Sequence, residues 1–191
     1  MPENHQTEPE STADWAENLR AYLRHTIEHR PGAKSALRRG LRRSPVECTR
    51  MHAFIPKHFV PHWGLDGARE RAVYTVAALA GTWPDLLNNR SGRTIGGALG
   101  ELGGDRRDWA ERRLTQLCRS DATQMNDRLA STISALARWG VTVDLAQLAR
   151  DLDRWEGNQA RIVRAWVRDF DAPSGGSGDE PVTVQSLLGG D

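Results

Sequence analysis

Cysteine is scarce in this sequence of 191 residues: only Cys48 and Cys118 are present, and they form no CxxC pair. A disulfide framework is therefore excluded, and two free thiols are typical of a reducing cytoplasm. Long hydrophobic runs are also missing, because the longest, residues 72–83, is too short to span a bilayer. The acidic, polar N-terminus does not resemble a secretory signal. We therefore expect a cytoplasmic protein with no membrane partner.

Lysine is nearly absent, since only Lys34 and Lys57 among the 26 basic residues are lysines. Arginine is preferred where a phosphate is bound by two parallel hydrogen bonds or where the planar guanidinium stacks on a base. A formal net charge of +1 would argue against a nucleic-acid partner, but the charges are segregated along the chain. Acidic residues crowd the N-terminus, at Glu3, Glu8, Glu10, Asp14 and Glu17.

No alternating strand pattern is present, and apolar residues recur at helical spacing along most of the chain. Capping residues that start helices are expected at Ser11 or Thr12, Asp66, Asp105, Asp121, Asp144, and Gly157 or Asn158. A second helix is expected over residues 33–43 and a short one over residues 94–102. Consecutive caps joined by short turns favour helix bundles. We predict an all-α fold of two packed helical bundle lobes with about nine helices.

The polar residues 85–94 mark the predicted boundary between these lobes. The predicted organisation is a disordered lead at 1–11, an N-terminal helical lobe at 12–84, a linker loop at 85–94, a C-terminal helical lobe at 95–171, and a flexible tail at 172–191.

Catalytic motifs are weak. His25, Glu28 and His29 match the inverted zinc-protease pattern HxxEH, but a zinc hydrolase needs a third ligand and a cleft. Two partly exposed histidines near a helix C-terminus are the simpler interpretation. A glycine-rich segment, residues 96–104, lacks the P-loop pattern and favours close helix packing instead. We predict a protein that is not an enzyme and holds no cofactor and no metal ion.

Arginine stripes are the strongest functional signal. Lys34, Arg38 and Arg42 stand at i, i+4 and i+8, and Arg39 and Arg43 widen that face with few acids nearby. Such a surface is typical of contact with phosphates. A solvated face with local ion pairs is the alternative.

Two further rows of basic residues follow. One comprises Arg112, Arg113 and Arg119, and the other comprises Arg161, Arg164 and Arg168. Arg106, Arg107 and Arg150 have acidic neighbours in sequence, so ion pairing is the better interpretation for them.

Several segments resemble one family. Residues 32–43 resemble the basic helix near the start of CasB proteins, the small subunits of the type I-E CRISPR surveillance complex, Cascade. Residues 94–99 resemble the family's small-residue helix, and residues 111–121 are similar to its ERR…L…L…R-D helix. Residues 140–152, Arg154-Trp155 and residues 167–170 are similar to its C-terminal signature. The matches run in order from about residue 14 to residue 171.

The resemblance implies an all-α protein of two helical lobes without a catalytic role. Two copies would associate head to tail along the CRISPR RNA-guided complex and contact its backbone and large subunits. They would bind the target and displaced DNA strands and stabilise the R-loop, with the CRISPR RNA left open as a further partner. The basic residues carried over are Arg38, Arg39, Arg112, Arg113 and Arg119 by matching position, Arg42 and Arg43 by adjacency, and Arg128 and Arg161 by a looser match.

Three other functions stay open on the sequence alone. A helix-turn-helix DNA-binding regulator could use the turn at Gly140, although the following helix is mostly apolar and acidic. A zinc hydrolase would use His25, Glu28 and His29. A pure scaffold would pair its arginines with acidic protein surfaces.

Overall fold

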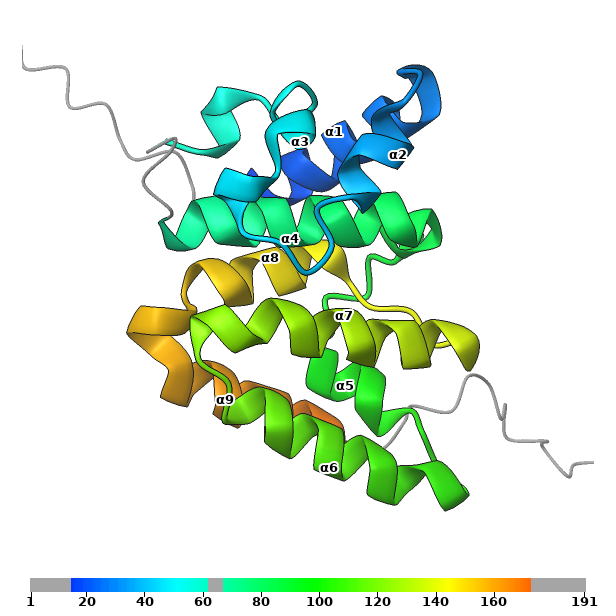
Figure 1. Ribbon diagram of the computed structural model, residues 1–191. Coiled ribbons are helices and arrows are strands. Elements are labelled where there is room, and N and C mark those ends of the chain that lie inside the picture. The colour runs from blue at the N-terminus through cyan, green and yellow to red at the C-terminus, as the bar shows by residue number, and fades with distance from the viewer. Residues whose placement is uncertain (1–14, 62–66, 173–191) are drawn as a thin grey trace, which may run out of the picture.

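The computed structural model describes residues 15–61 and 67–172, and within these ranges every regular element is helical (Figure 1). The α-helices are α1 (Trp15–His29), α2 (Ala33–Arg38), α3 (Thr49–His52), α4 (Ala68–Thr82), α5 (Ile95–Gly100), α6 (Arg107–Cys118), α7 (Ala122–Arg138), α8 (Leu145–Asp153) and α9 (Trp155–Asp171). Short 3-10 helices are η1 (Pro45–Glu47), η2 (Lys57–Phe59), η3 (Pro84–Asn88) and η4 (Gly104–Arg106). The predicted all-α fold with about nine helices is confirmed.

Some predictions fall on residues outside the described ranges. These are the lead at residues 1–11, the caps expected at Ser11 or Thr12 and at Asp66, and residues 173–191 of the predicted tail. Within the described ranges, none of the helices combines the length and apolarity that crossing a bilayer requires.

Helix α4 lies at the centre of the molecule, with α2 packed on one side and α8 on another (Figure 1). Residues 72–81 of this helix are all buried. A helix that is apolar around its whole circumference is stable only when neighbours cover every face. Gly81 allows the close approach of α2, because a Cβ atom there would lie 2.7 Å from the backbone nitrogen of Arg38.

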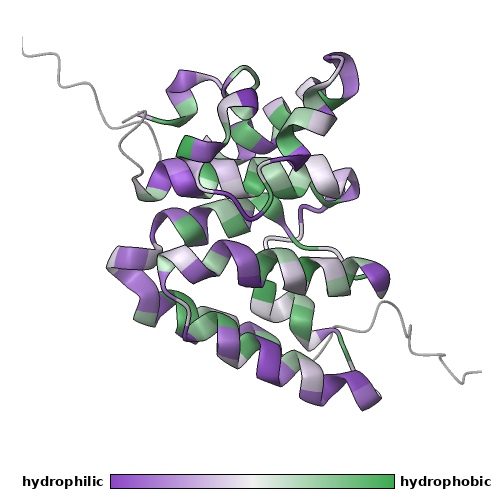
Figure 2. Cartoon of the chain, in the orientation of Figure 1, coloured by the Kyte–Doolittle hydropathy of each residue, from purple (hydrophilic) through white to green (hydrophobic). Residues whose placement is uncertain are grey.

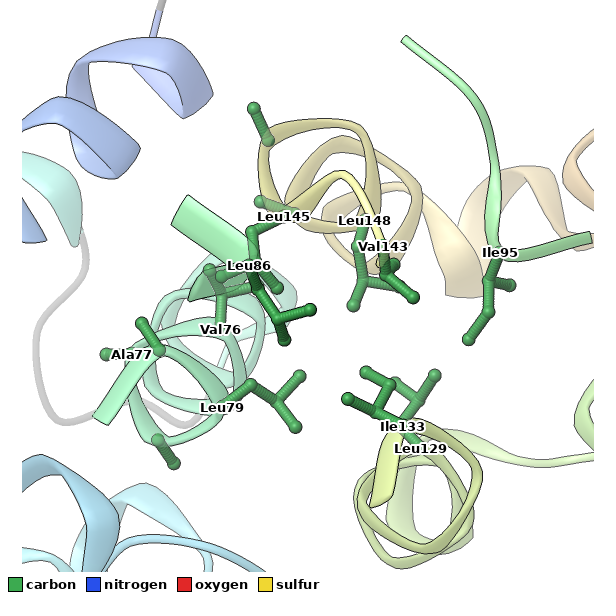
Figure 3. Close-up of a cluster of buried hydrophobic side chains, with 14 of the residues drawn as sticks. Val76, Ala77, Leu79, Leu86, Ile95, Leu129, Ile133, Val143, Leu145 and Leu148 are labelled. Carbon is green, nitrogen blue, oxygen red and sulfur yellow. The ribbon is translucent and has the colours of Figure 1, made fainter. Parts of the chain in front are cut away.

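One hydrophobic core joins residues from both sides of the 85–94 segment. Leu79 of α4 points toward Leu129 and Ile133 of α7, and Val76 lies beside Leu86 and near Leu145 of α8 (Figure 3). Each fully buried side chain of this size contributes about 2 kcal/mol. Figure 2 shows hydrophobic residues on the inward faces of the helices and hydrophilic residues on the outward faces. The division into two lobes at 85–94 stays a prediction, since α4 and α8 pack directly on each other.

Three predicted helix starts are confirmed by their capping hydrogen bonds. The Thr94 hydroxyl accepts from the backbone N–H of Gly97 at 3.4 Å. Asp121 accepts from the Gln124 N–H at 2.8 Å, and Asp144 accepts two backbone N–H groups of the first turn of α8. Each cap supplies an acceptor for an N–H group that has no partner inside its helix.

One predicted helix start is wrong, and another coincides with a kink. Asp105 does not cap α6, because it lies within η4, and α6 begins at Arg107 after Arg106. Gly104 has a left-handed conformation with φ of 55° and turns the chain one residue before Asp105, the residue that the cap pattern indicates. The start expected at Gly157 or Asn158 lies within α9, whose range begins at Trp155. Asn158 has non-helical dihedral angles (φ −136°, ψ 23°) and separates two helical segments, so a helix does begin after Asn158, as expected.

Glycines of α5 let it pack closely against α9, as the sequence predicts. A Cβ atom on Gly96 would lie 1.9 Å from the carbonyl oxygen of Trp166, and one on Gly100 would lie 2.5 Å from that of Phe170. No side chain larger than hydrogen fits between these two backbones, so the glycine-rich segment is a packing surface.

A buried arginine joins α1 to η3 and to the residue that follows it. Arg20 is only 2% exposed, and its guanidinium donates to the carbonyl oxygens of Leu87 and Asn89 at 3.4 and 3.1 Å. Its charge is balanced by Glu17, which also pairs with Arg150 of α8 at 3.5 Å. A charged group this deep is stable only when paired and hydrogen-bonded.

Candidate nucleic-acid interface

The first basic cluster lies on α2 and on the loop after it. The helix predicted over residues 33–43 ends at Arg38, and turns cover residues 39–42. Lys34 and Arg38 therefore share one helical face, but Arg42 is not on it. Arg42 adopts a left-handed conformation with φ of 64°, which turns the chain toward η1.

Gly40 explains why this helix stops early. A Cβ atom at Gly40 would lie 1.9 Å from the Met51 sulfur, so the loop packs directly on α3. This tertiary contact draws the chain away from the helical path although arginine and leucine are good helix formers.

The five basic side chains of this cluster are exposed. Lys34, Arg38, Arg39, Arg42 and Arg43 have no side-chain hydrogen bond and no ion pair with any other described residue. Glu47 is the nearby acid in sequence, and its carboxylate accepts from both the N–H and the hydroxyl of Ser44 at 3.0 Å. These hydrogen bonds, and more weakly the Arg43 charge, lower the pKa of Glu47. The cluster thus keeps a positive charge that its own chain does not neutralise by direct pairing.

The second cluster lies on α6. Arg112 and Arg119 are exposed and have no side-chain partner in the part of the chain that the structure describes. Arg113 is half-buried, lies over the Trp109 ring at 5.4 Å from its centroid, and donates to the Gln116 side chain at 3.0 Å. Two of the three predicted arginines of this helix, Arg112 and Arg119, are therefore available to a partner. The third, Arg113, contacts side chains of its own helix.

Arg128 makes hydrogen bonds within the protein. Its guanidinium donates to the Gln116 carbonyl at 2.5 Å and to the Ser120 hydroxyl at 3.2 Å. These contacts cap the C-terminal end of α6, where carbonyl groups lack helical partners. Arg128 therefore fixes the corner between α6 and α7, and its role in binding nucleic acid stays a prediction.

Helix α7 connects the two exposed clusters. In Figure 1, the loop after α2, helix α7 and helix α6 follow one another down the front of the molecule. Asn126 of α7 donates to the Arg43 carbonyl at 3.2 Å, and Arg128 of α7 holds α6 through the hydrogen bonds given above. We call the exposed basic residues of these two clusters the basic surface: Lys34, Arg38, Arg39, Arg42, Arg43, Arg112 and Arg119.

Arg161 lies apart from the basic surface. It lines a groove of about 450 Å³ between α8 and α9, together with Arg154 and Arg168. Arg119, in contrast, lies on the other flank of α9, near Val163 and Val167. The structure therefore does not bring Arg161 together with the other predicted binding residues, and its role stays a prediction.

Acidic groups also line the α8–α9 groove. Asp151 is 8% exposed, and its two carboxylate oxygens accept from Trp166 Nε1 at 2.7 Å and from Gln147 Nε2 at 2.9 Å. Burial raises the pKa of Asp151 to about 6, although these hydrogen bonds oppose the shift. Asp169 accepts from Arg168 and from Thr94 at the same groove. The groove thus carries mixed charge, unlike the basic surface.

Arg50 is a further basic residue beside this surface, and no pattern in the sequence indicates it. It is exposed on α3 and lines a groove of about 430 Å³ with Arg39 and Arg43. Because α3 is only four residues long and lies among prolines, no helical spacing connects Arg50 to the other arginines. Only the fold brings it to the basic surface.

The zinc motif has no additional ligand near it. His25 and His29 stack with their ring centroids 4.3 Å apart, and His29 Nδ1 is 3.0 Å from the His25 carbonyl oxygen. Within residues 15–61 and 67–172, no group of three or more His, Cys, Asp or Glu residues is placed to hold a metal ion.

The helix-turn-helix alternative conflicts with the position of α8. This helix follows the turn at Gly140 and packs against α1, α4 and α9, with Leu145, Leu148 and Ala149 buried. A recognition helix needs an exposed face that enters the major groove. Helix α8 instead forms part of the core.

Comparison with known proteins gives the family. Residues 33–170 match the model of the CRISPR-associated protein Cse2. A search of curated protein sequences gave no match. Among solved structures, a chain of a CRISPR RNA-guided surveillance complex superposes with a TM-score of 0.69 and 27% identity, covering 83% of this chain and 92% of that chain. A pre-nicking form of such a complex gives a TM-score of 0.67 and 27% identity over 84% of this chain and 93% of that chain.

The crystal structure of CasB from Thermus thermophilus is also similar, with a TM-score of 0.66 and 25% identity, covering 81% of this chain and 96% of that chain. The family match covers well over half of the sequence and agrees with the helical order described above. This chain belongs to the CRISPR-associated Cse2 (CasB) family.

Proposed function

We propose that this chain is the non-catalytic small subunit of a type I-E CRISPR RNA-guided surveillance complex, and that it holds nucleic acid on the basic surface. The observation that carries the proposal is the set of exposed guanidinium groups on α2, the following loop and α6, which have no ion-pair partners among the described residues. Membership of the Cse2 family supports the assembly into the complex.

Binding of this kind does not depend on base sequence. Guanidinium groups grip phosphate oxygens by paired, charge-assisted hydrogen bonds and release counterions from the nucleic acid. Opening a DNA duplex against a guide RNA exchanges one duplex for another at near balance, so contacts to the backbone can shift the equilibrium. The protein would thereby stabilise the R-loop, through the target strand, the displaced strand or both.

Protein partners are proposed from the same family relationship. The similar structures include chains of CRISPR RNA-guided surveillance complexes. We infer contact with the backbone and large subunits of such a complex, and with a second copy of this chain, in the cytoplasm. The α8–α9 groove, with its mixed charge, suits a protein surface better than a polyanion.

The test is fluorescence anisotropy with labelled single-stranded DNA, RNA and duplex DNA over a series of salt concentrations. We expect affinity that is independent of sequence and falls steeply with salt. A variant with Arg38, Arg39, Arg112 and Arg119 replaced by alanine should lose most of this binding. On a single strand, its slope of log K against log salt should become shallower by about 0.7 for each phosphate that the variant no longer neutralises.

The matched control removes the same charge elsewhere. Arg90, Arg138, Arg154 and Arg164 are exposed, and their side chains form no hydrogen bond or ion pair with the described residues, so their alanine variant changes net charge equally. Equal losses of affinity in the two variants would mean that net charge alone matters and that the basic surface is not the site. A native chain that binds complex subunits but no nucleic acid would support a pure scaffold.

A further inference from the structure

A groove beside the loop after α2 brings together three arginines from two segments. Arg39 and Arg43 come from the loop, and Arg50 comes from α3. The groove has a volume of about 430 Å³, and its other lining residues include Gly40, Thr49 and Met51. We call it the Arg50 groove.

The base of this groove is well packed. Met51 is 1% exposed and sits directly against Gly40, where a Cβ atom would overlap its sulfur. His52 holds α3 from the other side, with its ring Nε2 3.2 Å from the Pro45 carbonyl oxygen and its edge against the Tyr74 ring at 5.5 Å between centroids. The exposed Arg50 side chain therefore extends from a short helix whose position is fixed by buried neighbours.

The charge of the groove is strongly positive. The lining of the groove includes three arginines and a single acidic residue, Glu47, whose carboxylate accepts from Ser44 at the start of η1. Arg39, Arg43 and Arg50 make no side-chain hydrogen bond and no ion pair with the described residues. Like charges gathered in one concavity repel each other unless an anion lies between them.

We propose that Arg39, Arg43 and Arg50 together hold one phosphate group of the nucleic-acid backbone in the Arg50 groove. This inference rests on the proposed function and adds to it a specific subsite and a residue, Arg50, that no sequence pattern indicates. A phosphodiester has the charge and the oxygen atoms that planar guanidinium groups bind by two parallel hydrogen bonds. Its neighbouring sugars would lie along the open sides of the groove.

Glu47 gives the proposal a second consequence. Its carboxylate lines the same groove and repels an anion there, while its hydrogen bonds with Ser44 stabilise η1. Glutamine in its place would keep an acceptor for the Ser44 groups and remove the negative charge. The Glu47→Gln variant should therefore bind more tightly, which a variant that merely damages the fold would not do.

The test uses the full chain and labelled single-stranded DNA in the same salt series. Arg50→Ala should weaken binding about fivefold at low salt and reduce the salt slope by about 0.7, the value for one phosphate on a single strand. Arg50→Lys should fall between the alanine variant and the native chain, because lysine keeps the charge without the planar fork. Arg90→Ala, which removes an exposed arginine outside the groove, is the matched control and should change the slope less.

Glu47→Gln should strengthen binding about twofold, and Asp85→Asn, with the same change of charge on η3, should not match it. If the native chain binds but Arg50→Ala behaves like Arg90→Ala, the subsite is refuted and the proposed function stands. If the native chain binds no nucleic acid, both are overturned. Far-ultraviolet circular dichroism of each variant shows that its helices are intact.

Discussion

Replacing Asp151 with asparagine should stabilise the protein near neutral pH. The native carboxyl is buried between α8 and α9, accepts from the Trp166 and Gln147 side chains, and has its pKa raised to about 6 by burial. Asparagine has nearly the same shape. Its oxygen can accept from Trp166, and its amino group can donate to Gln147 once that side-chain amide flips.

The sign of the effect follows from proton linkage. An unfolded aspartate has a pKa near 3.9, so the folded protein binds this proton more tightly than the unfolded chain. The stability that the protonated carboxyl contributes is complete below about pH 4, decreases as pH rises to about 6, and is absent above that value. The groups facing Asp151 act in opposite directions, because Asp169 raises its pKa and Arg150 lowers it.

The magnitude comes from the size of the shift. A difference of about two pKa units corresponds to at most about 3 kcal/mol. Asp151 borders a groove that water enters, so we expect about 1–2 kcal/mol and a rise in Tm of roughly 4 °C at neutral pH. Below about pH 4 the native and variant proteins should be equally stable.

Thermal unfolding followed by circular dichroism between about pH 4 and pH 8 measures this difference. Asp85→Asn, which removes an exposed carboxylate from η3, controls for the change in net charge. The difference in Tm between the Asp151 variant and the native protein should change across this range. A constant difference would show that the buried, ionised carboxylate does not destabilise the folded protein. A variant less stable at every pH would show that the hydrogen bonds outweigh the cost of the buried charge.

Other substitutions test the packing and the buried polar contacts, each by chemical denaturation of the full chain. Gly96→Ala should destabilise the protein by about 3 kcal/mol, because its Cβ would overlap the Trp166 carbonyl oxygen and force α5 away from α9; a loss of stability under about 1 kcal/mol would show that the helices separate easily. Asp121→Ala should cost about 1 kcal/mol by removing the cap on the Gln124 N–H, while Asp121→Asn should restore most of it. Arg20→Met should cost about 3 kcal/mol, since the Asn89 carbonyl loses its donor and the Leu87 carbonyl keeps only Arg24; a neutral effect would mean that water replaces the guanidinium.

The sequence predicts much of the fold because local signals agree with the packing. Asp121 and Asp144 cap helices where the pattern places them, and Gly96 and Gly100 serve close packing as expected. The end of α2 could not be predicted in this way, because helical spacing continues to Arg43. The helix ends instead because Gly40 packs against Met51 of α3, a contact between two separate segments that helical spacing does not describe.

The candidate site was predicted less completely for a similar reason. Spacing identifies arginines on one helical face, but it does not show which guanidinium groups are used inside the protein. Arg128 matches the pattern and yet binds the end of α6, whereas Arg50 matches no pattern and lies beside Arg39 and Arg43. Both outcomes depend on contacts between different helices and loops, which helical spacing does not describe.

The burial of α4 on all sides has a consequence for how the chain folds. This helix gives one face to α2 and another to α8, so it needs partners from both halves of the sequence. A fragment ending at residue 84 would expose to water the apolar side chains that normally meet α7 and α8, among them Leu79 and Val76. The two halves should therefore lose their structure together, in a single cooperative unfolding transition, and neither should persist as an independently folded unit.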